Sequence, residues 1–137
     1  MSMIRLTTLA ALALLAAGPA LAAGENCADA ATQGAANACA ARELRAVDGQ
    51  LNAAYNQVMG RLKAEPAARA ALLESQRAWI RFRDAECAFS TVNGGGSVLP
   101  FLNARCQARL TEDRLRQLQD YLSCGEGELD CPVPAGN

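Results

Sequence analysis

Apolar residues recur every three to four positions through three long segments of the chain, which is the spacing of one face of an α-helix. The first segment runs from about Thr32, a suitable N-cap, to Ala64. Glu65-Pro66 ends it, and Pro66 suits the first turn of a second helix. The repeating apolar positions of the first segment are Leu44, Val47, Leu51, Tyr55, Val58 and Leu62.

The second segment extends from about Pro66 to Phe89, and the glycine-rich stretch Asn93–Gly96 after it is typical of a loop. A third helix is expected to begin at Ser97 as its N-cap, with Pro100 tolerated in its first turn. Because the connections are short, neighbouring helices should run antiparallel. The pattern therefore predicts an all-α fold, a small three-helix up-down-up bundle. The apolar positions of the third helix are Phe101, Leu102, Leu110, Leu115, Leu118 and Leu122.

The first 22 residues match a secretory signal peptide. Arg5 precedes the apolar run LAALALLAAG, and Pro19-Ala20-Leu21-Ala22 supplies the small residues of a cleavage site. A membrane anchor is the alternative, but the run is short for a span and no basic flank follows it. We therefore expect export to the periplasm or the medium, with no stable membrane span after cleavage. The expected parts are a signal peptide (1–22), a helical domain (23–122) and an acidic Gly/Pro-rich tail (123–137).

All six cysteines lie after the predicted cleavage site, and an even number in a short exported chain indicates disulfides. The layout favours Cys87–Cys106 across the glycine loop, Cys27–Cys39 at the start of the domain, and Cys124–Cys131 closing the tail. A Cys39–Cys87 bridge is an alternative, since antiparallel packing would bring these two residues close together. Zinc is the competing interpretation, but the chain has no histidine and no C-x2-C pair. We therefore expect a disulfide-stapled bundle with no metal and no cofactor.

Charge and composition exclude several classes of function. Cleavage would remove Arg5 from a chain of net charge −1 and leave −2, which lacks the basic surface of a nucleic-acid-binding protein. Without histidine or a G-x-S-x-G motif, a serine triad is excluded. Asp84 and Glu86 are the residue types of a glycosidase pair, but side chains two apart on a helix diverge by about 200°. The sequence therefore argues against an enzyme.

The stretch QRAWIRFRDAEC, residues 76–87, contains the only tryptophan and three arginines. On a wheel at about 100° per residue, Arg77 and Arg81 point toward solvent. Trp79 lies on the apolar stripe and is expected in the core rather than as a ligand platform. The residues that share this stripe are Leu72, Leu73, Gln76, Trp79, Ile80, Arg83 and Cys87.

Gln76 and Arg83 need partners on a buried face, because unpaired polar burial costs roughly several kcal/mol. Antiparallel folding about Glu65-Pro66 places position 83 near Asp48. The same register places position 76 near Asn52 and Tyr55. We predict an Arg83–Asp48 contact and a contact of Gln76 with Asn52 or Tyr55. Asp48, Asn52, Tyr55, Gln76, Trp79 and Arg83 would then form a buried polar seam, with a ligand site as the alternative.

Several spacings in this region form a combined motif over roughly residues 27–122. They are Leu51-Asn52-x-x-Tyr55, Gln76-x-x-Trp79-x-x-x-Arg83-Asp84-x-x-Cys87, Gly95-Gly96-Ser97, Cys106 and Thr111-x-x-Arg114, with Cys27, Cys39 and Thr32-Gln33 upstream. The chain thereby resembles the family of small exported domains named for the lysozyme inhibitor LprI. The resemblance implies a helical, disulfide-containing envelope domain without cofactor, and lysozyme inhibition. The named inhibitor is a lipoprotein, whereas Gly24-Glu25-Asn26 here separates the cleavage point from Cys27.

A lysozyme inhibitor must bind a basic protein whose cleft holds two carboxylates. The candidate partner-binding residues are Arg77 and Arg81 with Gly95 and Gly96 of the loop; the acidic tail (Glu126, Glu128, Asp130) is a second candidate. The leading hypothesis is an exported binding protein of the LprI type that protects the cell wall, with c-type lysozyme or another envelope protein as partner. The alternatives are an envelope adaptor that inhibits nothing and a hydrolase with an unrecognised acid pair.

Overall fold

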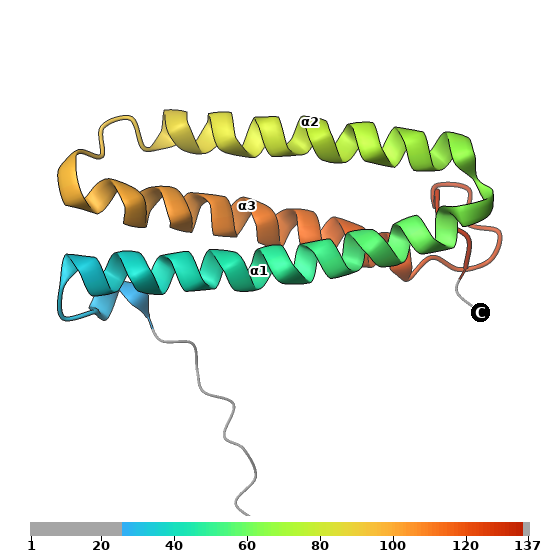
Figure 1. Ribbon diagram of the computed structural model, residues 1–137. Helices are drawn as coiled ribbons and strands as arrows, with labels where there is room; N and C mark the ends of the chain where they lie inside the picture. Colours follow the sequence, from blue (N-terminus) through green and yellow to red (C-terminus); the bar gives the residue numbers. More distant parts are fainter. Residues whose placement is uncertain (1–25, 136–137) are drawn as a thin grey trace, which may run out of the picture.

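The computed structural model describes residues 26–135 and contains three long helices joined by short connections (Figure 1). Helix α1 spans Gln33–Arg61, α2 spans Pro66–Ser90 and α3 spans Leu99–Leu122. Helix α3 packs most extensively on α1, and α2 packs mainly on α3. The described residues contain no strand, so the predicted all-α up-down-up bundle is confirmed. The predicted signal peptide lies outside the described residues.

Short 3₁₀ turns precede each long helix: η1 (Cys27–Asp29), η2 (Leu62–Ala64) and η3 (Gly96–Val98). The Thr32 hydroxyl accepts a hydrogen bond from the Ala35 amide at 3.1 Å, which confirms Thr32 as the N-cap of α1. The expectation for Ser97 is wrong, because Ser97 lies inside η3 and the N-cap position of α3 is Val98. The Ser97 carbonyl instead accepts a hydrogen bond from the Asn37 amide group at 3.0 Å, which ties η3 to α1.

The core lies mainly between α1 and α3. The predicted apolar stripe of α1 supplies it, with Val58 and Leu62 almost fully buried, and Leu118 of α3 packs against them. The tail after α3 forms no helix, but Cys124 and Val133 are buried in the same core, which the sequence pattern did not indicate. A second, smaller cluster around Cys27, Cys39 and Phe101 closes the other end of the bundle.

Helix α2 buries much less than its sequence pattern predicts. Only Gln76 and Cys87 are buried along its whole length. Leu73 and Ile80 were expected on the buried stripe, but they are 37% and 41% exposed, so this part of the prediction is wrong. The buried strip of α2 is therefore narrower than the apolar stripe on the wheel. Trp79 and Leu72 are partly buried and pack against the core.

Three disulfides link Cys27 to Cys39, Cys87 to Cys106, and Cys124 to Cys131, with Cα–Cα distances of 5.5, 5.6 and 5.8 Å. The favoured pairing is therefore the one observed, and the Cys39–Cys87 alternative is not formed. Only Cys87–Cys106 joins two long helices, α2 and α3. Within residues 26–135, no helix combines the length and apolar character needed to cross a bilayer.

Candidate functional site

Arg83 stands at the centre of a polar cluster between the helices. Its Nη1 donates to Asp48 Oδ1 of α1 at 3.2 Å and to Thr111 Oγ1 of α3 at 3.4 Å. Its Nε donates to the neighbouring Asp84 at 3.0 Å, and the guanidinium lies over the Trp79 ring, 5.2 Å from the centroid. The predicted Arg83–Asp48 contact is present, and Arg83 links all three helices. Because its contacts are with residues of all three helices, Arg83 is suited to holding the helices together.

Arg114 of α3 forms the second half of the cluster. Its Nε donates to Gln76 Oε1 at 3.1 Å, and its Nη2 donates to Ser75 Oγ at 3.1 Å. The third contact is from Nη1 to Gln117 Oε1 at 3.0 Å. The predicted contact of Gln76 with Asn52 or Tyr55 is therefore wrong. Gln76 faces α3 rather than α1, because α2 packs mainly on α3. Asn52 is exposed and Tyr55 is partly buried at the core.

Sequence reasoning did not place Thr111 and Arg114 in the seam, although both are buried, Thr111 fully. Their burial could have been predicted from the sequence, because Thr111 and Arg114 share a helix face with Leu115 and Leu118. Burial lowers the pKa of the Arg114 guanidinium, and a coulombic interaction with Tyr121 partly opposes that shift. Among the described residues no carboxylate forms an ion pair with Arg114. A buried cation with only neutral acceptors is unusual, because buried charges are normally paired.

Apolar side chains are exposed where α2 meets the glycine loop and α3 begins. Phe89 is 75% exposed and Val92 is 71% exposed, and Leu99 and Leu102 are partly exposed nearby. We call these four residues the loop-end surface. A hollow of about 590 Å³ adjoins it, lined largely by apolar side chains that include Leu44 of α1. Exposed aromatic and aliphatic side chains beside a hollow are typical of a protein-binding surface.

The loop under this surface is held by several contacts. The Thr91 hydroxyl donates to the Cys87 carbonyl at 2.7 Å, and the Gly94 amide donates to the Thr91 carbonyl at 2.8 Å. Gly96 has φ +59°, which favours glycine, and a Cβ at Gly94 would lie only 3.1 Å from the Thr91 carbonyl oxygen. Gly95 has no such requirement. The loop therefore presents Val92 on a fixed backbone.

Arg77 and Arg81 are exposed on α2, as the helical wheel predicts. Arg81 forms an exposed ion pair with Glu74 at 3.4 Å. At about 1.5 Å rise per residue, Arg77 lies about 20 Å from the end of α2, so the structure does not bring it together with Gly95 and Gly96. The acidic tail residues Glu126, Glu128 and Asp130 are exposed, and Glu128 accepts a hydrogen bond from the Gly125 amide at 3.1 Å.

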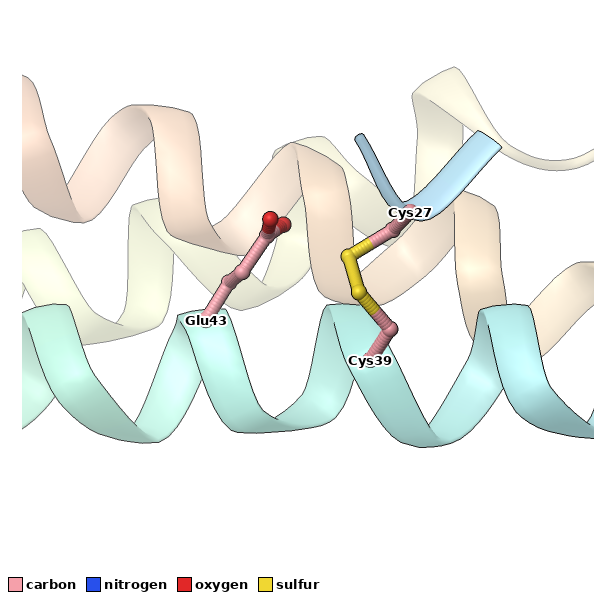
Figure 2. A group of neighbouring side chains, drawn as sticks. All are labelled: Cys27, Cys39 and Glu43. Atoms are coloured by element: carbon pink, nitrogen blue, oxygen red, sulfur yellow. A yellow bond between two sulfur atoms is a disulfide. The ribbon is translucent and has the colours of Figure 1, made fainter. Parts of the chain in front are cut away.

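Two groups in the described residues have the side-chain types of a metal site. One is Cys27, Cys39 and Glu43 (Figure 2), and the other is Cys124, Glu128 and Cys131. Figure 2 shows the two sulfurs of the first group bonded to each other, with the Glu43 side chain rising from the next turn of α1. Cysteine binds metals as a thiolate, and a disulfide sulfur is not one. In this oxidised form, the cysteines of both groups act as structural disulfides.

These features define a small helical domain with local disulfides, a polar cluster between its helices and an exposed apolar surface at one end. The chain belongs to the LprI family: the family described as "Lysozyme inhibitor LprI" matches residues 25–118. A relative from Rhizobium meliloti (strain 1021), "Uncharacterized protein R02472", is 33% identical over 113 residues, which cover 74% of this chain and 81% of that protein. No solved structure matches the chain.

Proposed function

We propose that this protein is an exported inhibitor of lysozyme that protects the cell wall, without enzymatic activity of its own. The observation that carries the proposal is the family match over residues 25–118, which covers almost all of the three helices. The predicted signal peptide supports export to the periplasm, where lysozyme would be met. Three disulfides suit an oxidising compartment.

The loop-end surface is the part of the described chain best suited to contact the enzyme. Its central residues, Phe89 and Val92, stand on a backbone fixed by the Cys87–Cys106 disulfide and the Thr91 hydrogen bonds. A rigid apolar protrusion loses little conformational entropy on binding. Arg81 lies on the same helix, where its guanidinium would favour the carboxylates of a lysozyme cleft.

The proposal is tested by adding the purified, oxidised protein to c-type lysozyme and following the lysis of a cell-wall suspension. The rate of lysis should fall as inhibitor is added and should level off once the lysozyme is saturated. Undiminished lysis at large molar excess would refute inhibition of that lysozyme class.

A pair of variants locates the surface. Phe89→Ser should weaken inhibition by about tenfold or more, because exposed aromatic residues commonly dominate interface energies. Leu129→Ser is the matched control, since Leu129 is fully exposed in the tail at the other end of the molecule. Both changes should leave the unfolding midpoint nearly unchanged, because both side chains are exposed in the free protein. Equal inhibition by the two variants would place the contact elsewhere.

An envelope adaptor is the second candidate function. Phe82 is 55% exposed on α2, about two turns from Phe89 on the same side of the helix, so the apolar surface extends beyond the loop end. Such a strip would fit a helix of another protein. Recovery of an endogenous partner from a periplasmic extract by the wild type but not by Phe82→Ser, together with undiminished lysis, would favour the adaptor.

A further inference from the structure

A cavity of about 210 Å³ is lined by residues of all three long helices and of the tail. The tail lies at the end of the bundle opposite the glycine loop (Figure 1). Most of its lining is apolar and includes Val58, Leu72 and Val133. A cavity of about 150 Å³ lined by apolar side chains can hold a benzene molecule, so a cavity of about 210 Å³ has room for an aliphatic chain of medium length.

Three of the residues that line this cavity carry polar groups. Arg114, Ser75 and Tyr121 all line it. The three hydrogen bonds of the Arg114 guanidinium go to neutral acceptors, while a guanidinium has about five N–H donors. Donors are therefore left for a further acceptor. The absence of a carboxylate partner among the described residues leaves a positive charge beside an apolar space.

We propose that this cavity binds a small amphiphilic carboxylate, with the carboxylate on Arg114 and an aliphatic chain of medium length among the apolar side chains. An anionic head would supply the countercharge that Arg114 lacks, and an Arg–carboxylate contact is among the stronger hydrogen-bonded pairs. The Ser75 and Tyr121 hydroxyls are further donors for the same head group. An inorganic anion would gain nothing from the apolar lining, because it has no chain to bury.

Isothermal titration of the oxidised protein with octanoate tests the site, and octanol serves as a probe with the same chain and a neutral head. Octanoate should bind saturably at one site, and octanol at least about tenfold more weakly, since a charged hydrogen bond is lost. Arg114→Met should weaken octanoate by about tenfold and change octanol binding little. Arg116→Met, an exposed arginine on the same helix, is the matched control and should bind octanoate as the wild type does.

A second pair of variants keeps the test decisive if Arg114→Met fails to fold. Ala68 lines the cavity and Ala67 beside it is exposed. Ala68→Leu should fill part of the cavity and weaken both probes by about tenfold, and Ala67→Leu should weaken neither. No saturable octanoate binding, or equal binding of octanoate and octanol, would overturn the proposal. These titrations contain no lysozyme, so their outcome does not depend on whether the protein inhibits lysozyme.

Discussion

The guanidinium of Arg83 lies 3.2 Å from the carboxylate of Asp48, which joins α2 to α1 across 35 positions of the sequence. Their side chains are 15% and 38% exposed, so water screens the pair only in part. Among the ion pairs of the described residues, this one alone joins two long helices. Helix α2 buries only two residues, and its position therefore depends on such polar contacts to an unusual degree.

A double-mutant cycle on Asp48→Ala and Arg83→Met should show a coupling of about 1 kcal/mol in the free energy of unfolding. Arg83→Met alone should cost about 2 kcal/mol, because it also removes the contacts to Thr111 and Trp79. Urea denaturation measures both. The control is the cycle on Glu74 and Arg81, whose side chains are 67% and 66% exposed and should couple by less than about 0.3 kcal/mol. Equal coupling in the two cycles would contradict this account.

Gln76→Leu should destabilise the protein by about 2 kcal/mol, because it leaves the Nε of the buried Arg114 without an acceptor. Gln76→Glu keeps an acceptor and adds a countercharge, so it should cost less than about 1 kcal/mol. Chemical denaturation with circular dichroism measures both. Gln57→Leu, at an exposed position of α1, is the matched control and should be near neutral. A Gln76→Leu variant as stable as this control would show that the Arg114 contact contributes nothing.

Removing the Cys87–Cys106 disulfide by two serine substitutions should cost about 3 kcal/mol, given its 19-residue separation. Amide hydrogen exchange should rise first along α2, since α2 has few other buried contacts. The same double change at Cys124 and Cys131, with a separation of 7, should cost less and leave α2 protected. Uniform loss of protection across all three helices in the first variant would mean that α2 is not an independently opening unit.

Gly96→Ala should cost about 1 kcal/mol, because Gly96 has φ +59° and an L-residue is strained there. Gly95→Ala should be nearly neutral, since a Cβ at Gly95 meets nothing within 4 Å. Thermal unfolding of the two variants compares neighbouring glycines in one loop. If both lower the midpoint equally, the loop backbone does not have the conformation described here.

The three helices were predictable because their signals are local. The spacing of Val47, Leu51 and Val58 fixes the buried face of α1, and Pro66 begins α2 whatever the packing around it. The same layout favoured the observed disulfide pairing, in which each cysteine pairs with a sequence neighbour, although it also left a Cys39–Cys87 bridge open. The Arg83–Asp48 contact could be predicted from the antiparallel register alone.

The errors arose where the sequence does not say which neighbour a helix prefers. The prediction for Gln76 assumed that α2 packs on α1, whereas Gln76 meets Arg114 of α3. Leu73 and Ile80 were placed in the core because the wheel shows which residues share a face but not how much of that face is covered. Tail residue Val133 was missed because one apolar residue among glycines and prolines has no periodicity to reveal its burial. In the candidate site, the exposure of Phe89 and Val92 depends on the loop geometry, which no local pattern encodes.

The six cysteines are bonded in consecutive pairs along the sequence: Cys27–Cys39, Cys87–Cys106 and Cys124–Cys131. A chain that crosses a membrane from its N-terminus presents its thiols to an oxidant in that same order. If each pair closes before the next pair emerges, the complete native set forms without reshuffling. For a protein exported as proposed, this connectivity would reduce the need for a disulfide isomerase, because the order of the cysteines along the chain already gives the native pairs.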